Sequence, residues 1–316
     1  MTRKECFEKC LDDKQNARLT RAALREEAIG RAAEENPRIA DIDKMLAVLC
    51  AKIPAAAISG NAEELEHIKL TVTQLNEERT ALLKQAGVDF GEYICEKCQD
   101  TGYVDGKFCD CVKAAATELF VKELARIAPV DKCRFGNFDL SFYPDASTEN
   151  GNPKKRMTEI LGLCEDYAAN FDPHGSPSLL FMGNTGLGKT HLSLALAYEL
   201  LIRGFDVIYG SAYNLFAKME NEHFALHTDE SYTAAVECDL LIIDDLGGEF
   251  VSPYIQSLVY NIINTRLLAG RPTVINTNLS MAEINRIYTP RVASRLLGEY
   301  TAKRFIGNDI RQQKSI

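Results

Sequence analysis

The chain has 316 residues, of which 46% are hydrophobic and 26% are charged. Its formal net charge of −9 argues against a protein that coats nucleic acid by bulk electrostatic attraction alone. The most apolar run, LSLALAYELLI, is too short to cross a bilayer, and the first residues lack the apolar core of a signal peptide. We therefore expect a cytoplasmic protein with no membrane partner, long enough for two domains.

Residues from about 15 to 90 have the pattern of a helical region. Apolar residues recur there at steps of three and four, which places them on one stripe of each helix. The first stripe comprises Ile39, Ile42, Leu46, Leu49 and Ile53, and the second comprises Leu65, Ile68, Val72, Leu75 and Leu82, with Arg79 at the missing position. Pro54 predicts the end of the first helix, and the short link after it favours an antiparallel hairpin. A partner-binding hairpin and a plain helical bundle remain equal alternatives.

A cysteine-rich segment follows, with Cys95, Cys98, Cys109 and Cys111 in a C-x2-C-x10-C-x-C arrangement. Two close pairs separated by a turn-rich loop can converge into a tetrahedral site of four sulfurs, so we predict structural Zn²⁺. Redox chemistry is the alternative, but the βαβ pattern of a thioredoxin-like protein does not surround the segment. Among the other cysteines, Cys6 and Cys10 are unassigned, and the expected core thiols are Cys50, Cys133, Cys164 and Cys238.

From residue 178 onward, short β-rich runs alternate with helical patterns. The strand-like runs are SLLFM, DVIYG, DLLIID and TVINTN, and the helical runs between them are HLSLALAYELL, NLFAKME and YIQSLVYNIINTRLL. This alternation predicts an α/β domain in which a parallel sheet is wrapped by helices.

Residues 183–190 read GNTGLGKT, a full match to the phosphate-binding loop pattern G-x-x-x-x-G-K-[ST]. The loop follows a strand-like run and opens a helix, which is the context that the pattern requires. Glycines let the backbone N–H groups approach phosphate oxygens, and the helix adds its positive dipole end. The predicted nucleotide-binding residues are Gly183, Asn184, Thr185, Gly186, Leu187, Gly188, Lys189 and Thr190. Lys189 is expected to contact the β- and γ-phosphates of ATP, and Thr190 to ligate Mg²⁺.

The run LLIIDD ends in Asp244 and Asp245, which suits a buried strand that delivers acids to the same site. We expect Asp244 to hold the Mg²⁺ shell and Asp245 to orient or deprotonate the attacking water. Asn278 ends the next strand-like run and could reach the γ-phosphate or the attacking water. Arg291 and Arg295 lie four residues apart on one helical face, where they could act in trans on a neighbouring subunit.

The run of motifs CEKCQDTGYV, FGNFDLSFY, GNTGLGKT, LLIIDDLG, TVINTN, RVASRL and GNDIR resembles the bacterial helicase-loader family of AAA+ ATPases. This is the DnaC/DnaI type, which is related to IstB-like ATP-binding proteins. The resemblance covers residues from about 90 to the end of the sequence.

The resemblance implies nucleotide and Mg²⁺ binding by Lys189 and Thr190, with Asp244 and Asp245 as the second acidic motif. It also implies that Asn278 is a sensor, that Arg295 is the arginine finger and that Arg291 is its alternative. Phe135 and Phe138 are expected near the adenine, and Arg311 as a second sensor.

Two features depart from many AAA+ proteins. Asp245 stands where glutamate is common, so we expect slow hydrolysis that assembly or DNA stimulates. The sequence also ends soon after Arg295, so we expect no C-terminal helical lid.

Three regions are expected: a helical partner-binding region over 1–90, a zinc-binding module with a linker helix over 91–130, and an AAA+ domain over 131–316. The leading hypothesis is an ATPase that assembles with itself and loads a replicative helicase onto single-stranded DNA. An IstB-like ATPase that regulates a transposase is the alternative. A small-molecule kinase and a zinc adaptor that only binds ADP or ATP are rivals from other classes.

Overall fold

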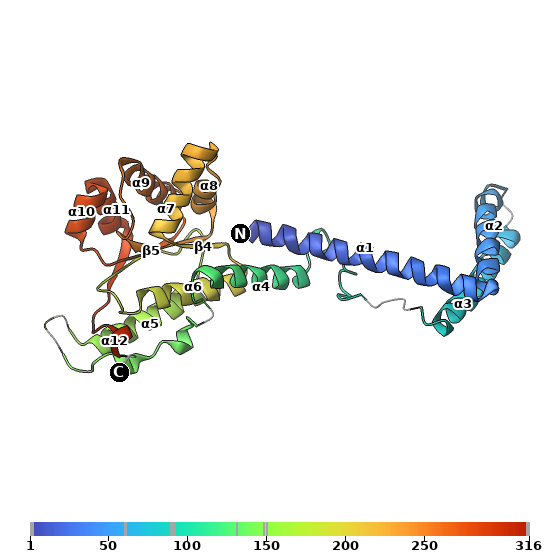
Figure 1. The fold of residues 1–316 in the computed structure, drawn as a ribbon, viewed down its shortest axis with the longest axis horizontal. Helices are drawn as coiled ribbons and strands as arrows, with labels where there is room; N and C mark the ends of the chain where they lie inside the picture. The colour runs from blue at the N-terminus through green and yellow to red at the C-terminus, as the bar shows by residue number, and fades with distance from the viewer. Residues whose placement is uncertain are drawn as a thin grey trace. The chain divides into compact units, whose positions relative to one another are not determined.

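The computed structural model describes residues 3–59, 62–88, 93–130, 132–147, 149 and 151–313. The chain divides into a helical unit, Lys9–Val112, and a sheet unit, Met1–Glu8 with Lys113–Ile316. Figure 1 shows both units as a ribbon. Two helices cross the division, α1 (Arg3–Glu35) and α4 (Asp110–Ile127). Within the described residues, none of the helices has both the length and the apolar character needed to cross a membrane.

In the helical unit, α2 (Pro37–Ser59) and α3 (Ala62–Gln85) pack against each other through the two predicted apolar stripes. The stripe residues Ile39, Ile42, Ile68 and Leu75 are buried. Arg79, the polar position of the second stripe, forms an ion pair with Asp43 of α2. A small core therefore holds the predicted hairpin, because each apolar stripe is covered by the facing helix.

Two details of the helical region differ from the sequence expectation. The first helix, α1, begins at Arg3, well before the expected start near residue 15. Pro54 does not end α2, which continues through it to Ser59. A proline inside a helix leaves the carbonyl four residues earlier without its usual donor. That carbonyl belongs to Cys50, an exposed residue, where water can solvate it; Cys50 is therefore not a core thiol either.

The sheet unit is built on a five-stranded parallel sheet with the order β4-β5-β6-β3-β7. Its strands are β3 (Ser178–Met182), β4 (Val207–Ser211), β5 (Leu240–Leu246), β6 (Thr273–Thr277) and β7 (Tyr300–Arg304). The three central strands are nearly continuous buried runs, as expected for a sheet covered on both faces. The fold confirms the predicted α/β class, with β7 as an edge strand that the sequence pattern did not reveal.

Helices cover both faces of the sheet (Figure 1). One layer contains α5 (Pro153–Ala169) and α6 (Lys189–Ile202). The other contains α7 (Ala212–Asn221), α8 (Glu230–Glu237), α9 (Pro253–Leu268), α10 (Met281–Tyr288) and α11 (Pro290–Glu299). Helices of the second layer bury apolar side chains against β5 and β6 in one large core. Short turns complete the unit: η1 (Phe135–Asn137), η2 (Leu140–Phe142), η3 (Glu222–Leu226) and α12 (Ile310–Gln313).

Helix ends follow local sequence signals. Asn152 caps α5 by accepting a hydrogen bond from the Lys155 N–H group, and Pro153 follows at the first helical position. Ser280 and Glu283 form a reciprocal capping box at the start of α10. These caps fix where each helix begins, and so fix the loops that lie between strand ends and helices.

Candidate functional site

The predicted phosphate-binding loop joins the end of β3 to the start of α6. Gly186 and Gly188 have positive φ angles of 72° and 88°, a conformation that favours glycine. A Cβ atom on Gly188 would lie 2.7 Å from the Phe138 ring, and one on Gly186 would collide with the Asp309 carboxylate. The backbone can therefore wrap tightly only because these positions carry no side chain.

Lys189, the first residue of α6, points its ammonium group back into the loop. Its Nζ donates hydrogen bonds to the carbonyl oxygens of Gly183 and Asn184 at 2.6 and 2.7 Å, and to Asn278 Oδ1 at 2.6 Å. Burial lowers the pKa of Lys189 to about 8, against the opposing charges of Asp244 and Asp245. A buried cation held among carbonyl oxygens is well suited to receive phosphate oxygens.

Thr190 and Asp244 meet at the adjacent strand end. The Thr190 hydroxyl lies 3.1 and 3.0 Å from the two carboxylate oxygens of Asp244. A hydroxyl and a carboxylate are oxygen ligands of the kind that Mg²⁺ prefers in nucleotide sites. These residues therefore fit a magnesium ion, which would neutralise phosphate charge there.

Asp245 and Asn278 complete this edge of the site. Asn278 donates a hydrogen bond from Nδ2 to Asp245 Oδ1 at 2.9 Å while its own Oδ1 accepts from Lys189. Asp245 is exposed and has a positive φ of 56°, an uncommon conformation for a residue with a side chain. Such strain is often found at functional positions, and here it turns the carboxylate toward Asn278 and the cavity.

A cavity of about 510 Å³ extends from these residues to the segment before α5. Phe138, Cys133 and Tyr143 line it on that side, with Arg311 at the C-terminal side. The Tyr143 hydroxyl donates a hydrogen bond to the Leu187 carbonyl oxygen at 2.9 Å. The Tyr143 ring stacks on the Phe138 ring, with the two ring centroids 5.7 Å apart. The volume and the mixed lining suit a nucleotide. Of the two phenylalanines expected near an adenine, Phe138 lines the cavity, whereas Phe135 is not among its described lining residues.

The C-terminal segment returns to the loop after β7. The N–H group of Ile310 donates a hydrogen bond to the Gly186 carbonyl oxygen at 3.0 Å, and that of Phe305 donates to the Met182 carbonyl oxygen at 2.7 Å. Arg291 and Arg295 lie on α11, exposed and half-buried respectively, and neither is among the described residues that line the cavity.

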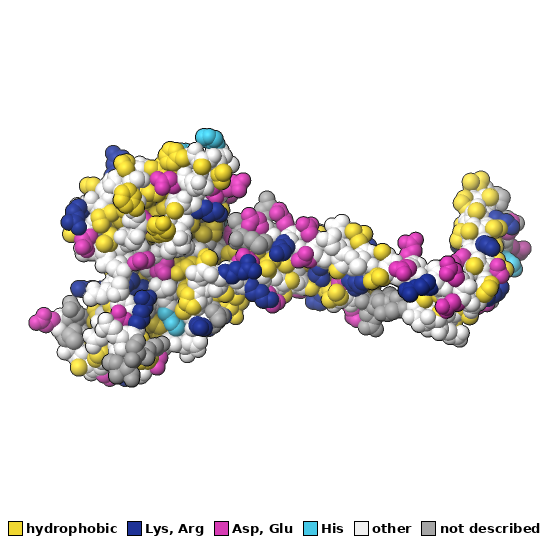
Figure 2. Space-filling view, in the orientation of Figure 1, with side chains coloured by type: hydrophobic (Ala, Val, Ile, Leu, Met, Phe, Trp, Pro, Cys, Tyr) yellow, Lys and Arg dark blue, Asp and Glu magenta, His cyan; other side chains and the backbone are white. Residues whose placement is uncertain are grey.

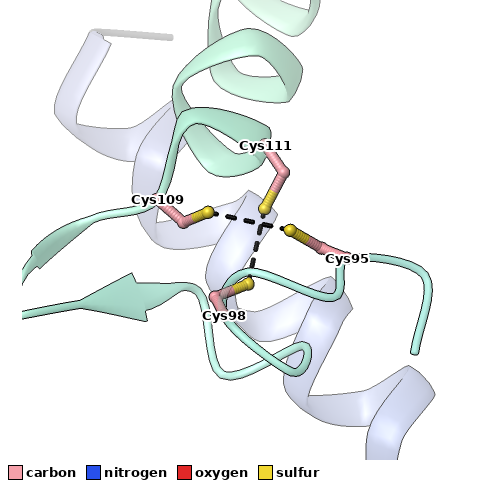
Figure 3. A group of neighbouring side chains, drawn as sticks. All are labelled: Cys95, Cys98, Cys109 and Cys111. Atoms are coloured by element: carbon pink, nitrogen blue, oxygen red, sulfur yellow. Dashed lines mark hydrogen bonds between the residues drawn. The ribbon is translucent and has the colours of Figure 1, made fainter.

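The four predicted cysteines converge in the helical unit (Figure 3). Their sulfur atoms all lie within 4.8 Å of one another. The sulfur atoms of Cys95 and Cys109 are 3.7 Å apart, and those of Cys98 and Cys111 are 3.6 Å apart. A tetrahedral zinc site with Zn–S bonds of about 2.3 Å requires sulfurs about 3.8 Å apart. The cluster therefore fits one zinc ion.

The loop between the cysteine pairs is a small hairpin of β1 (Tyr103–Val104) and β2 (Lys107–Phe108). Asp105 and Gly106 form its turn with positive φ angles, as a tight hairpin turn requires. Asp100 braces the cluster, because its carboxylate accepts hydrogen bonds from the N–H groups of Ile94 and Cys95, each at 3.0 Å. Arg21 Nη2 donates to the same carboxylate at 2.6 Å, which ties the cluster to α1.

Sequence reasoning missed residues that surround Asp244. Tyr209 of β4 donates its hydroxyl to Asp244 Oδ2 at 2.7 Å, and Asn276 of β6 donates its amide to Oδ1 at 2.6 Å. Asn276 lies two residues before Asn278, so the alternation of a strand could have placed both on one face. Tyr209 carried no sequence signal, because its role depends on which strand pairs with β5.

Solved structures that match part of the chain include a crystal structure of the DnaC helicase loader. That structure has 21% sequence identity and a TM-score of 0.45, and the match covers 54% of this chain and 98% of that chain. The crystal structure of DnaI has 19% identity and a TM-score of 0.45, with 57% of this chain and 92% of that chain covered.

Residues 172–300 match the family model described as IstB-like ATP binding protein. The replicative helicase loader DnaC of Escherichia coli (strain K12) is 30% identical over 43% of this chain and 56% of its own length. The replicative helicase loader DnaC of Buchnera aphidicola subsp. Baizongia pistaciae is 26% identical over 52% of this chain and 63% of its own length. The chain thus spans a little over half the length of these relatives. The sheet unit is thus similar to IstB-like ATP binding proteins over residues 172–300, and part of the chain is similar to the DnaC helicase loaders.

Proposed function

We propose that the chain is an ATP-hydrolysing loader of a replicative DNA helicase. The observation that carries the proposal is the joint placement of Lys189, Thr190, Asp244 and Asn278 around one cavity, in a domain similar to those of two helicase loaders. Lys189 binds the terminal phosphates, and Thr190 and Asp244 hold Mg²⁺. Asp245 orients the attacking water. Asn278 contacts both Asp245 and the γ-phosphate and so fixes their relative positions.

Hydrolysis in this proposal depends on assembly. The described lining residues of the cavity include Arg311 but neither Arg295 nor Arg291. An arginine finger supplied by a neighbouring copy stabilises charge on the transferring phosphoryl group. Arg295 of one subunit therefore serves the ATP of the next, with Arg291 as the alternative. Asp245 has a shorter reach than glutamate, so turnover by the isolated chain is slow.

The N-terminal regions supply the partner contact and a metal-stabilised module. Residues 1–90 bind the helicase, residues 91–130 hold one structural zinc through the four cysteines, and residues 131–316 bind nucleotide. The hairpin offers exposed apolar side chains for the contact, because Val48 of α2 and Leu70 of α3 are 56% and 59% exposed.

An aromatic surface supports the DNA part of the proposal. His223 and Phe224 of the π-helical turn η3 meet Tyr254 of α9, with ring centroids 4.9 to 5.2 Å apart. Phe224 remains 60% exposed, and Figure 2 shows hydrophobic side chains over this face of the sheet unit. Aromatic rings presented in this way can stack on unpaired bases.

The charge around the aromatic surface indicates how DNA would bind. Burial and then the carboxylates of Asp229 and Glu220 raise the pKa of the Tyr254 hydroxyl. Because these two carboxylates lie near the Tyr254 ring, we expect base stacking rather than phosphate contacts to supply the affinity. Binding to single strands should therefore depend only weakly on salt concentration, unlike binding by a basic groove.

Replacing Phe224 tests this surface. Stacking on one aromatic side chain contributes about 1–3 kcal/mol per base, so Phe224→Ala should weaken single-strand binding by about tenfold. Fluorescence anisotropy with a labelled oligothymidine, in the presence of ATP, measures the change. Phe250→Ala is the matched control, because Phe250 is 88% exposed but lies outside the aromatic cluster. Equal affinities of the two variants would contradict the assignment.

The identity of the partner separates the proposal from its alternative. Because residues 172–300 match an IstB-like family model, regulation of a transposase is the alternative function. Affinity purification of the tagged full chain from its native cell, with ATP present, should recover a replicative helicase. Recovery of a transposase without the helicase would favour the alternative.

A further inference from the structure

Asp244 is held by more donors than its magnesium role requires. It is buried, with 8% of its surface exposed, and it accepts hydrogen bonds from three side chains. One of them, the Thr190 hydroxyl, is itself an expected magnesium ligand. The other two, from Tyr209 to Oδ2 at 2.7 Å and from Asn276 to Oδ1 at 2.6 Å, come from residues outside the phosphate-binding loop.

The three residues lie across adjacent strands. Asp244 is on β5, Tyr209 is on the neighbouring strand β4, and Asn276 is on β6 at the other side of β5. Each carboxylate oxygen therefore has one donor from its own side. A carboxylate fixed at both oxygens cannot rotate freely about its Cβ–Cγ bond, while each oxygen keeps a lone pair for another contact.

The Asn276 side chain lowers the stability of the fold at this position. It is fully buried in a central strand, and its Oδ1 has no hydrogen-bond partner among the described residues. A buried carbonyl oxygen without a partner destabilises the fold, whereas an apolar side chain would avoid the loss. Its amide group nevertheless makes two contacts, to Asp244 and to Ser193 Oγ at 2.8 Å. The side chain therefore serves the site more than the core.

We infer that Tyr209 and Asn276 are positioning residues that hold the Asp244 carboxylate in the orientation in which it supports Mg²⁺ beside Thr190. The inference deepens the proposed nucleotide site and rests on it, but it does not depend on helicase loading. Neither residue contacts nucleotide in this scheme. Their loss should weaken the magnesium-dependent part of nucleotide binding and leave the magnesium-free part intact.

Tyr209→Phe tests the inference with little change in shape. Binding of a fluorescent ADP analogue to the full chain is measured first in EDTA and then over a series of Mg²⁺ concentrations. Affinity in EDTA should stay within about twofold of the wild type. The Mg²⁺ concentration for half-maximal enhancement should rise by about five- to tenfold, as expected for the loss of one hydrogen bond to a charged group.

Asn276→Leu is a second variant with the same number of side-chain heavy atoms, and it should shift the Mg²⁺ midpoint in the same direction. Tyr300→Phe is the control, because it removes a buried hydroxyl from β7 of the same sheet and leaves the donors of Asp244 in place. Thermal melts monitored by circular dichroism verify that the variants are folded.

The two affinities distinguish positioning from a general structural role. A loss of affinity in EDTA equal to the loss with Mg²⁺ would show that Tyr209 only supports the fold, and would overturn the inference. An unchanged Mg²⁺ midpoint in folded Tyr209→Phe would also overturn the inference. Nucleotide binding by the wild type that does not depend on Mg²⁺ would overturn it as well. Failure to load a helicase, with these shifts observed, would refute the proposed function alone.

Discussion

At the scale of single residues, the lysine that we propose to bind phosphate is held in place by hydrogen bonds within the protein. Lys189 donates hydrogen bonds to two loop carbonyl oxygens and to Asn278 Oδ1. Asn278 in turn donates a hydrogen bond to Asp245, so Lys189, Asn278 and the Asp245 carboxylate form one chain of contacts. A phosphate bound at Lys189 would therefore affect the position of Asp245 through the side chain of Asn278 alone.

The lowered pKa of Lys189 predicts a pH dependence of nucleotide binding. Burial holds this pKa at about 8 in the free protein, below its ordinary value of 10.5. Bound phosphates favour the charged ammonium group and so raise the pKa in the complex. Above pH 8 the free protein must take up a proton on binding, and affinity should fall by up to about tenfold per pH unit. Below pH 7 this contribution should disappear.

Calorimetry in two buffers of different ionisation enthalpy measures this proton uptake directly. Near pH 8.5 the observed binding enthalpy should differ between the buffers, and near pH 6.5 this lysine should contribute no difference. Lys189→Ala should lose tight ATP binding altogether. An affinity that stays constant up to pH 9.5 would contradict the assigned role of the lysine.

Some residues of the candidate site belong to short contiguous sequence motifs, whereas others come together only through strand pairing. Lys189 and Thr190 belong to one contiguous pattern, and Asp244 ends a recognisable strand, so the sequence identifies them. Tyr209 and Asn276 become neighbours of Asp244 only after β4, β5 and β6 pair in the observed register. Strand order is a long-range property, and a single sequence carries little information about it.

At the scale of elements, the cysteine module should depend on its metal. The hairpin of β1 and β2 has two residues in each strand, too few to be stable alone. Four thiolates around one Zn²⁺ would supply the missing stabilisation, and the contacts of Asp100 would extend it to α1.

Elemental analysis of protein purified without added metal should find one zinc per chain. Replacing both Cys109 and Cys111 with serine should abolish zinc binding and lower the melting temperature of the helical unit. Cys50→Ser should leave the zinc content unchanged, because Cys50 is exposed and outside the cluster. Full zinc retention in the double variant would rule out this ligand set.

Element types were more predictable than element ends. The alternating runs after residue 178 gave four of the strands, because continuous apolar runs between helical patterns are typical of parallel sheets. The strand β7, with the sequence YTAKR, escaped notice, since an edge strand can alternate with charged residues. Pro54 misled the assignment of α2, because packing against α3 outweighs one lost hydrogen bond.

At the scale of the whole molecule, hydrolysis should require contact between copies. Arg295→Ala should bind ATP almost normally, since its own phosphate-binding loop is intact, yet hydrolyse it poorly. An arginine finger contributes about a thousandfold or more to hydrolysis, so the loss should be large.

Mixing Arg295→Ala with Lys189→Ala is the sharper test of shared sites. Some contacts in the mixture pair an intact loop with an intact finger, so part of the activity should return. A mixture that stays inactive while both variants fold and assemble would move the assignment to Arg291. Normal hydrolysis by Arg295→Ala alone would have the same consequence.

The central claim, that this chain uses ATP to place a helicase on DNA, is tested most directly by a loading assay. The replicative helicase of the same organism is mixed with circular single-stranded DNA covered by single-strand binding protein, and unwinding of an annealed strand is followed. The account predicts unwinding only when the wild-type chain and ATP are both present, with Lys189→Ala inactive. Unwinding that is indifferent to the chain, or that Lys189→Ala supports as well as the wild type, would contradict it.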